Sequence, residues 1–416
     1  MTATTWPTTR LKNLVEPIQT GVWGADPNGD DDDILCVRVA DFDRQRFGLK
    51  PVETVRSVSE KDRSSRLLCA GDILLEKSGG TDMNPVGFTV MFEGDYPAVS
   101  SNFIGRVRMR NGQHPRFWLY ALAASYFTRR TQKCVRQTTG IQNLDQSAFF
   151  NEVFAVPPLG EQRVIADYLD RETARIDILI EEQQRLIEML RERRDSAWAA
   201  CVETAGRLGR RTSIRRVIDS IVDGPFGSSL TSAHYSDEGA RVIRLGNIGI
   251  DEFKDHDAAF IPLDYASELD THAVEEGDVV VAGLGDDKMP LGRAAVVPAL
   301  GPAIVKADCY RLRPNARVSA EYLAWVLSAP QTRSQIMLLA RGSTRARLNT
   351  KVMQQVEIPL PNRDAQDGLV AQSHAETAKI HSLIAETERF IELARERRSA
   401  LITAAVTGQT DVRAVA

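Results

Sequence analysis

ETARIDILIEEQQRLIEMLRERR at residues 172–194 and ETAKIHSLIAETERFIELARERR at residues 376–398 are two copies of one segment. The offset is a constant 204 positions without a gap, and 14 of the 23 positions are identical. A repeat of this length in a chain of 416 residues indicates two copies of one structural unit. Two similar units in one chain predict a pseudo-twofold molecule, suited to a two-part target or to two copies of a partner.

In both copies the apolar residues follow a and d heptad positions, the pattern of paired helices. Polar residues interrupt the two patterns at matching places, as at Gln183 and Thr387, and such interruptions fix register. Each helix spans about 40 residues, or about 60 Å, which exceeds what a globular domain needs. We therefore predict an antiparallel coiled-coil stalk, although helices packed on their own domains would show a similar pattern. The helix-pairing residues would be Leu169, Ile176, Leu179, Leu186, Leu190, Ile380, Leu383, Phe390 and Leu401.

The similarity continues outside the helices. AGDILLEKSGG at 70–80 matches EGDVVVAGLGD at 276–286, and both contain short apolar runs typical of strands. RFWLYALAAS at 116–125 matches EYLAWVLSAP at 321–330, both with helical spacing. We predict an α+β fold of two α/β domains joined by the two long helices. The expected bounds are 1–157 and 207–360 for the domains, 158–206 for the central helix, 361–410 for the C-terminal helix and 411–416 for a tail.

The composition is that of a soluble globular protein, with 43% hydrophobic and 26% charged residues. No apolar run approaches the ~18 to 20 residues that span a bilayer, and the N-terminus does not resemble a signal peptide. The five cysteines are scattered, odd in number and form no CxxC, so we expect reduced thiols in a cytoplasmic protein. The six histidines are equally dispersed and predict no metal site.

Basic residues gather at corresponding places in both halves, although the net charge of the chain is −4. Residues 103–150 contain eight Lys or Arg and one acid, and residues 303–351 contain nine Lys or Arg and two acids. A solvated face is the usual explanation of one such cluster. Because the cluster recurs in both repeats, a nucleic-acid-binding surface is as good an explanation as a solvated face.

We find no catalytic motif in the sequence. The GxxxxGK(S/T) loop, the GxSxG elbow, the HExxH motif and the Pro-Pro-aromatic tetrapeptide of amino-methyltransferases are absent. VVVAGLGDD at 279–287 resembles a strand followed by a nucleotide loop, and EFK at 252–254 and DDK at 286–288 resemble part of a nuclease site. None of the three repeats in the other half, so we expect no catalytic and no metal-ligating residue.

Two loop sets carry residues suited to reading DNA. RQTTGIQNLD at 136–145 and ARGSTRARLN at 340–349 are rich in the side chains that bond base edges and phosphates. GVWG at 21–24 and GPFG at 224–227 place an aromatic between glycines, which suits either a ligand-contacting loop or a plain turn packed on its aromatic. The sets differ in residues, which is expected of two readers with separate targets. The candidate DNA-binding residues are Trp23, Arg38, Lys77, Ser78, Arg106, Arg136, Gln137, Thr138, Thr139, Gln142, Asn143, Phe226, Ser228, Arg244, Lys288, Lys306, Arg341, Ser343, Thr344, Arg345, Arg347 and Asn349.

These features together resemble the specificity subunit (HsdS) of type I restriction-modification systems, over essentially the whole chain. The resemblance is carried by PLGEQ at 158–162, the ETARID and ETAKIH segments, the RERR ends and the GPFGS start of the second unit. The second helix entry departs from the pattern, because it reads PNRDAQ and retains only Gln366 of the final Glu-Gln pair. We expect this departure to alter a local cap and not the fold.

The resemblance implies that two target-recognition domains each read half of a bipartite double-stranded DNA site. It implies that the helices set the spacer between the half-sites and dock two methyltransferase subunits. S-adenosylmethionine, ATP and Mg would then be cofactors of the methyltransferase and of the restriction (motor) subunits, and this chain would hold none.

Three other functions remain open at this stage. A coiled-coil adaptor that assembles proteins would share the repeated helices, although it would not need the basic segments twice. A fused methyltransferase or nuclease is the enzymatic alternative, and it lacks its motifs. A specificity subunit of a modification-only phage-defence system, without the motor subunit, has the same sequence features.

Overall fold

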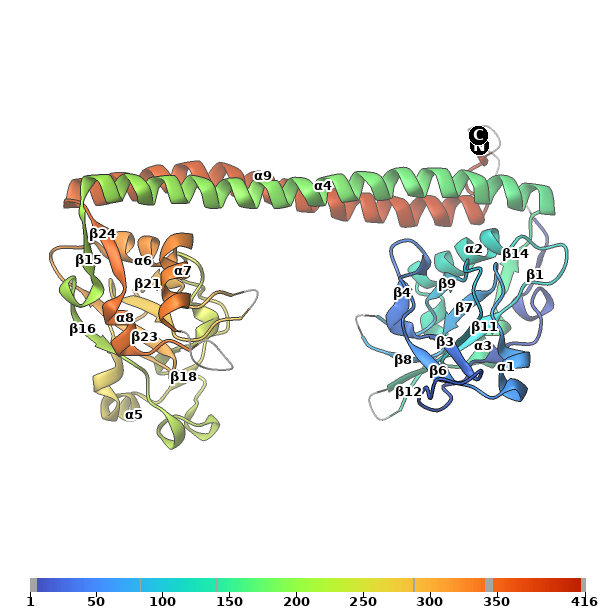
Figure 1. The fold of residues 1–416 in the computed structure, drawn as a ribbon, viewed down its shortest axis with the longest axis horizontal. Helices are drawn as coiled ribbons and strands as arrows, with labels where there is room; N and C mark the ends of the chain where they lie inside the picture. The colour runs from blue at the N-terminus through green and yellow to red at the C-terminus, as the bar shows by residue number, and fades with distance from the viewer. Residues whose placement is uncertain (1–5, 83, 139–140, 287–288, 341–346, 413–416) are drawn as a thin grey trace. The chain divides into compact units, whose positions relative to one another are not determined.

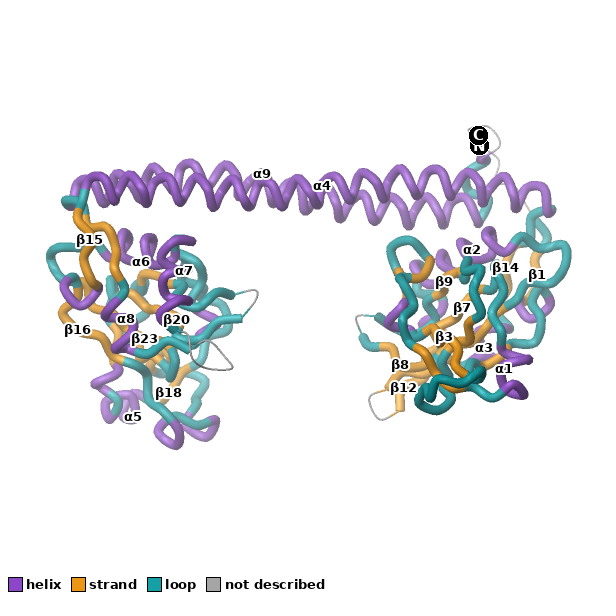
Figure 2. The backbone as a smooth tube through the Cα atoms, in the orientation of Figure 1, coloured by secondary structure: helices purple, strands orange, loops and turns teal. Residues whose placement is uncertain are grey.

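The computed structural model describes residues 6–82, 84–138, 141–286, 289–340 and 347–412. The chain forms two compact units, which we call unit 1 (Met1–Arg185 with Thr387–Ala416) and unit 2 (Leu186–Glu386). Two long helices, α4 (Leu159–Leu208) and α9 (Arg363–Val406), contribute residues to both units (Figure 1). Figure 2 shows that the rest of each unit mixes strands, short helices and loops. The predicted α+β architecture with two long helices is confirmed.

Unit 1 begins with a series of short strands, which three short α-helices and three 3-10 helices interrupt among its described residues. Its helices are α1 (Glu60–Arg66), α2 (Pro115–Phe127) and α3 (Gln146–Phe150). Its strands are β1 (Thr8–Arg10), β2 (Gln19–Thr20), β3 (Asp33–Val37), β4 (Phe42–Asp43), β5 (Gly48–Leu49), β6 (Val55–Ser57), β7 (Ile73–Glu76), β8 (Ser78–Gly80), β9 (Thr89–Met91), β10 (Ala98–Ser100), β11 (Ile104–Val107), β12 (Val135–Thr138), β13 (Ile141–Leu144) and β14 (Val153–Ala155).

Unit 2 repeats this plan after α4. Its short helices are α5 (Leu263–Glu268), α6 (Ala320–Ser328), α7 (Pro330–Leu339) and α8 (Thr350–Gln355). Its strands are β15 (Arg210–Ser213), β16 (Ile218–Val222), β17 (Ala240–Ile243), β18 (Phe260–Ile261), β19 (Ala273–Val274), β20 (Val279–Ala282), β21 (Ala294–Val296), β22 (Ala303–Val305), β23 (Cys309–Pro314) and β24 (Glu357–Leu360).

The two units share one four-stranded sheet and two strand pairs. Among the described residues the order β2-β11-β7-β9 in unit 1 corresponds to β16-β23-β20-β21 in unit 2, and all neighbours are antiparallel. Each unit also has one parallel pair, β3 with β10 and β17 with β22. A two-stranded pair closes each unit, β1 with β14 and β15 with β24. The sequence repeat is therefore a repeat of fold.

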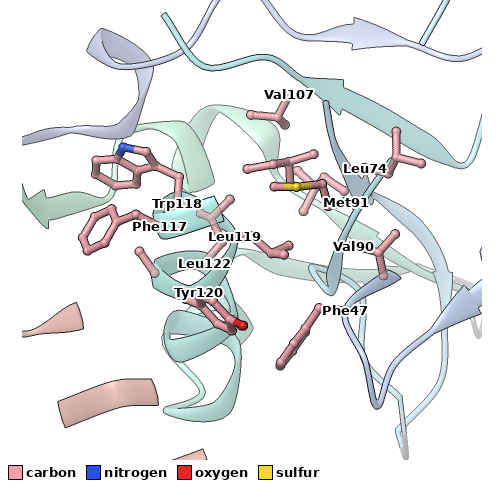
Figure 3. Close-up of a cluster of buried hydrophobic side chains, with 14 of the residues drawn as sticks. Phe47, Leu74, Val90, Met91, Val107, Phe117, Trp118, Leu119, Tyr120 and Leu122 are labelled. Carbon is pink, nitrogen blue, oxygen red and sulfur yellow. The ribbon is translucent and has the colours of Figure 1, made fainter. Parts of the chain in front are cut away.

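The core of unit 1 lies between the strands and the long helices. All four residues of β7 are buried, as is every residue of α2 from Phe117 to Ser125. A helix that is apolar all round needs partners on both sides, and α2 packs against β9 on one side and against Ile165 and Leu169 of α4 on the other. Figure 3 shows Trp118, Leu119 and Tyr120 among the buried side chains. In unit 2, α6 occupies the same place against β21.

A buried glutamine joins each globular part to its long helix. Gln162 of α4 accepts from the His114 backbone N–H at 2.8 Å and donates to the Pro157 carbonyl at 2.9 Å. Gln366 of α9 makes the same contacts, with the Ser319 N–H at 2.9 Å and the Pro361 carbonyl at 2.9 Å. The second helix entry, in which only Gln366 of the final pair is retained, therefore preserves the side chain that fixes the helix.

The two helices pack side by side and antiparallel within each unit. In unit 1 Asp177 of α4 forms an ion pair with Arg398 of α9, Oδ1 to Nε at 3.0 Å. The buried seam residues repeat at spacings of three or four, with one step of seven from Ile180 to Ile187, as in a coiled coil. They are Thr173, Ile176, Ile180, Ile187 and Leu190 in α4, and Thr377, Ile380, Ile384, Thr387 and Ile391 in α9.

The predicted helix-pairing residues need correction at four positions. Leu169, Ile176, Leu190 and Ile380 are buried, and Leu401 is partly buried. Leu179, Leu186, Leu383 and Phe390 are instead 45%, 36%, 49% and 46% exposed. Each has an isoleucine as its next residue, and that isoleucine fills the seam. Because both neighbours are apolar, the heptad pattern fits either phase, and only the packed structure selects one.

Candidate nucleic-acid interface

A three-stranded sheet of described residues in unit 1 carries much of the candidate set. β12 pairs antiparallel with β13, and β13 pairs antiparallel with β8. Arg136 lies opposite Asn143, and the Ser78 hydroxyl donates to Asn143 Oδ1 at 2.5 Å. The stretch 136–145, predicted as a loop, is therefore a β-hairpin in its described residues, with side chains alternating between the two faces. Gln137 is exposed on β12, and Thr138 ends that strand.

The alternation places one candidate on the inner face. Gln142 is 6% exposed, and its amide nitrogen donates to Asp82 at 3.3 Å. Its neighbours Ile141 and Asn143 are exposed. An outward-reading role for Gln142 is therefore contradicted by the register of the hairpin. Asn143 carries the accessible amide at this place.

β8 also borders a pocket of about 450 Å³. Trp23, Arg38 and Ser78 line it, so the fold brings these three candidates together. Asn102 and Phe103 line it as well, and Phe103 is 47% exposed. The sequence analysis missed both, although an aromatic beside an amide in a basic segment is a usable signal for base contact.

Trp23 is 40% exposed and covered on one face by a cation. The Arg56 guanidinium lies 4.5 Å from the centroid of the indole, and Arg56 Nε donates to the Trp23 carbonyl at 3.0 Å. Asp26 forms an ion pair with Arg56 at 2.5 Å. Sequence reasoning did not find Arg56, because it is 33 residues from Trp23 and nothing local links them.

Three basic candidates of unit 1 are partly committed to the fold. Arg38 binds Asp41 at 2.9 Å, and Arg106 donates to the Leu67 carbonyl at 2.8 Å. Burial lowers the pKa of Lys77. Arg136 is the most open of the set, with 75% of its side chain exposed beside Asp145. Exposed ion pairs of this kind are worth about 0–1 kcal/mol, so a phosphate can take over such an arginine at small cost.

The glycine loops owe their composition to close backbone packing. A Cβ on Gly21 would lie 2.1 Å from the Ser100 carbonyl oxygen, and a Cβ on Gly224 would lie 2.1 Å from the Lys306 carbonyl carbon. These two glycines therefore hold their loops against the neighbouring chain. The aromatic that follows each loop start is turned outward, because Trp23 and Phe226 are 40% and 49% exposed.

Unit 2 repeats the pairing of an aromatic with an arginine. The Arg347 guanidinium lies 5.4 Å from the centroid of the Phe226 ring, and its Nε donates to Asp308 at 2.8 Å. Asp223 holds the start of the Phe226 loop and Asp308 in place, since its Oδ1 accepts from Gly224 N at 2.8 Å and from Asp308 N at 3.0 Å. Burial raises the pKa of Asp223 to about 6. Asp223 was not among the predicted site residues.

The other described candidates of unit 2 differ in whether their side chains are free to contact DNA or are bound within the fold. Arg244 is paired with Asp257 at 2.6 Å. The Lys306 ammonium lies 5.6 Å from the centroid of the Tyr235 ring. Ser228 is exposed, whereas the Asn349 side chain accepts from Val352 N at 2.9 Å as the cap of α8. That cap gives Asn349 a structural explanation. Candidates outside the described residues are Thr139, Lys288, Arg341, Ser343, Thr344 and Arg345.

Comparisons with known proteins give one family. Residues 37–189 match the model of the type I restriction modification DNA specificity domain. The chain is 22% identical over 247 residues to the type I restriction enzyme MjaVIII specificity subunit of Methanocaldococcus jannaschii, covering 56% of each protein. It is 24% identical to the StySPI specificity subunit of Salmonella potsdam, covering 42% of this chain and 37% of that one. The matches thus span about half the length of these relatives or less.

A solved structure agrees over the full length of the chain. It comes from work on complex assembly and conformational transition of the type I R-M system, and it has 15% sequence identity to this protein. The TM-score is 0.68, with 98% of this chain and 99% of that chain covered. At this identity the likeness shows the fold.

The helices give one further finding. No helix within the described ranges combines the length and apolar character that a bilayer crossing requires. The repeat, the two units with their paired helices and the match of residues 37–189 to the type I restriction modification DNA specificity domain agree, and the chain is similar to the specificity subunits of type I restriction-modification systems.

Proposed function

We propose that the chain is a DNA-recognition subunit in which each unit reads one half of a bipartite double-stranded site. One observation carries this proposal. Each unit presents an outward aromatic with an arginine on its face, Trp23 with Arg56 in unit 1 and Phe226 with Arg347 in unit 2. Arg347, whose side chain is 51% exposed, can supply phosphate or guanine contacts, whereas the Arg56 side chain is 14% exposed and holds Trp23 in place. The ring of each pair supplies apolar contact to a thymine methyl.

The two sites differ enough to read different sequences. Unit 1 adds a hairpin with Arg136 and Asn143, and its pocket contains Asn102 and Phe103. Unit 2 adds Lys306 near its own arginine-aromatic pair, because the Gly224 loop packs on the Lys306 backbone. An asymmetric target follows from this difference, since base preference depends on which side chains reach the groove.

The helices support docking of two copies of one partner. Beyond their buried seam, the helices expose apolar side chains at positions related by the offset of the repeat. In unit 1 these are Leu179, Phe390 and Leu393, and in unit 2 they are Leu383, Leu186 and Met189, respectively. Exposed apolar rows mark interaction surfaces. In this proposal two methyltransferase subunits bind there, and a restriction subunit joins them.

The chemistry then belongs to the partners. In this proposal the chain itself has no catalytic activity, S-adenosylmethionine is bound by the methyltransferase subunits, and ATP and Mg are used by the motor subunit. The helices also set the spacer between the half-sites. The lack of a catalytic motif in the sequence is consistent with this division of labour.

Matched variants in the two units test the proposal. Trp23→Ala and Phe226→Ala each remove one exposed ring, and the complex with methyltransferase subunits is assayed for methylation of a library of DNA sites. We expect Trp23→Ala to relax selection in one half-site only, and Phe226→Ala to relax selection in the other half-site only. If both variants changed the same half, or neither changed the motif, the assignment of one half-site to each unit would be wrong.

A further inference from the structure

Unit 2 contains a cavity of about 350 Å³ that the proposed DNA reading does not use. It lies where α4, α9, α6 and α7 approach the turn at residues 250–252. Trp198 and Trp325 form an aromatic wall, with ring centroids 6.4 Å apart and planes at 22°. Arg194, Arg333 and His374 line the remainder. Its volume falls at the lower end of the range for small-molecule sites, about 300–1,000 Å³.

The corresponding place in unit 1 is filled by a side chain. Phe47 has a left-handed φ of 56°, and so does Asp251, 204 positions later, at 58°. The Phe47 ring meets Tyr120 edge-on with ring centroids 6.0 Å apart, and the Arg398 guanidinium lies 4.5 Å from the Phe47 centroid. Figure 3 labels both Phe47 and Tyr120. Tyr120 corresponds to Trp325 in the aligned helices α2 and α6. Unit 1 thus seats an aromatic ring where unit 2 has the cavity.

The polar groups around this place are rearranged in the same comparison. Arg398 corresponds to Arg194, and its ion-pair partner Asp177 corresponds to His381. Both Arg194 and His381 line the cavity. In unit 2 Arg194 therefore lacks the cross-helix carboxylate, and it binds its neighbour Asp195 at 2.9 Å instead.

The cavity offers hydrogen-bond donors that the described residues leave unused. Trp198 is 8% exposed, and its indole Nε1 is buried without an acceptor in the described structure. Arg333 Nε is likewise buried and without an acceptor there. Buried donors without partners cost about 1–3 kcal/mol each, so a ligand that brings acceptors relieves that cost.

The charges select the sign of the ligand. Asp251 is neutralised by His374, Oδ2 to Nε2 at 2.7 Å, and Asp195 is engaged by Arg194. No ion pair to Arg333 is recorded among the residues that the structure describes, although its guanidinium is partly buried. Glu252 also lines the cavity, but it is exposed to solvent, whereas Arg333 Nε is buried. Arg333 is therefore the buried cation without a recorded pair among the described residues, and it favours an anion with acceptor oxygens.

We propose that this cavity binds a small aromatic carboxylate, with the ring against the Trp198–Trp325 wall and the carboxylate at Arg333. The ring takes the place that Phe47 takes in unit 1. The carboxylate accepts from Arg333, and the Trp198 N–H donates to a further acceptor of the ligand. The site joins both long helices to the globular part of unit 2, so occupancy stiffens that junction. This inference does not depend on DNA recognition.

The test uses the full chain and two probes, benzoate and 2-naphthoate. Ligand-observed saturation-transfer NMR detects binding, and quenching of tryptophan fluorescence by 2-naphthoate gives the Kd. We expect both acids to bind, whereas benzyl alcohol and benzylamine, which lack the carboxylate, do not. Binding of all four compounds alike would reduce the site to a nonspecific apolar cavity and overturn the proposal.

Three variants locate the bound probe. Arg333→Met keeps the aliphatic stem and should raise the Kd by about tenfold or more, as loss of a charge-assisted bond predicts. Ala378→Trp, at an exposed helix position on the rim, should abolish binding by filling the cavity. Arg397→Met removes the same charge from an exposed position on α9 outside the cavity and should leave the Kd unchanged. Circular dichroism confirms that each variant is folded.

Two results would overturn the proposal. One is the absence of binding of either acid at 10 mM, a concentration on the order of a weak fragment Kd. The other is a Kd that Arg333→Met and Ala378→Trp leave unchanged.

The same titration in the complex with methyltransferase subunits distinguishes a small-molecule ligand of the cavity from a partner side chain that fills it. Loss of binding there, without loss in the isolated chain, would assign the cavity to a side chain of the partner.

Discussion

Gln366 is the residue whose removal has the most calculable effect on unit 2. It is fully buried, accepts from the Ser319 N–H at 2.9 Å, and donates to the carbonyls of Arg317 at 3.0 Å and Pro361 at 2.9 Å. Gln366→Met preserves the volume and removes all three bonds. Arg317 is exposed, so its carbonyl can turn to water. The Ser319 N–H and the Pro361 carbonyl remain buried and unpaired.

The expected loss follows from those two orphaned groups. Each buried, unsatisfied backbone group costs about 1–3 kcal/mol, so Gln366→Met should destabilise unit 2 by about 3 kcal/mol. Hydrogen exchange resolves the effect by residue, and the Ser319 amide should lose protection first. Gln162→Met should produce the same loss in unit 1, with the His114 amide as its reporter.

The control lies on the same helix. Gln372 is exposed, and among the described residues its side chain donates to Glu376 alone, so Gln372→Met should change the free energy of unfolding by less than about 0.5 kcal/mol. A loss below about 1 kcal/mol for Gln366→Met would refute the reasoning. So would equal loss of protection in both units, because the contacts of Gln366 lie in unit 2 alone.

Three further predictions concern DNA binding, pH and spacing. Arg347→Ala should weaken DNA binding and reduce the slope of log K against log salt by about 1, as loss of one phosphate contact requires; an unchanged slope would remove Arg347 from the interface. Because burial raises the pKa of Asp223 to about 6, the folded state binds its proton more tightly, so stability should fall as pH rises from about 4 to 6. We expect that fall in the free energy of unfolding to be about 1 kcal/mol after allowance for the partial exposure of Asp223. Denaturation curves at several pH values should show that Asp223→Asn abolishes it, and a fall that persists in this variant would contradict its assignment to Asp223. Inserting four residues in α4 should change the spacer of the recognised DNA motif, and an unaltered spacer would reject the proposed ruler.

The repeat made the architecture predictable from sequence. A segment present twice with matching apolar spacing requires two similar environments, and the strands flanked by Gly and Asp at 70–80 and 276–286 became β7 and β20. The hairpin β12–β13 was taken for a loop, because polar residues occupy most of it and the two apolar residues of β13, Ile141 and Leu144, lie on opposite faces and show no apolar alternation. Short polar strands are set by pairing with a third strand, here β8, and that pairing is not local.

The site was less predictable than the architecture, because its contacts also join residues that are distant in the sequence. Trp23 and Phe226 were recognised from their glycine loops, but their cations come from distant positions in the chain. Asp223 lies next to the second loop, yet its role depends on the Asp308 N–H, 85 residues away. Phe47 and Asp251 occupy equivalent turns in the two units. Phe47 fills the core of unit 1, whereas Asp251 leaves a cavity in unit 2, and this difference depends on the packing of all elements around the turn.

The most direct test of the account is the DNA motif that this chain specifies. The chain is co-expressed with a methyltransferase subunit of its family, and adenine methylation is mapped across a host genome by single-molecule sequencing. The account predicts a bipartite, asymmetric motif with a fixed gap, one half of which relaxes in the Phe226→Ala variant. A contiguous motif, or no methylation from a soluble stoichiometric complex, would contradict it.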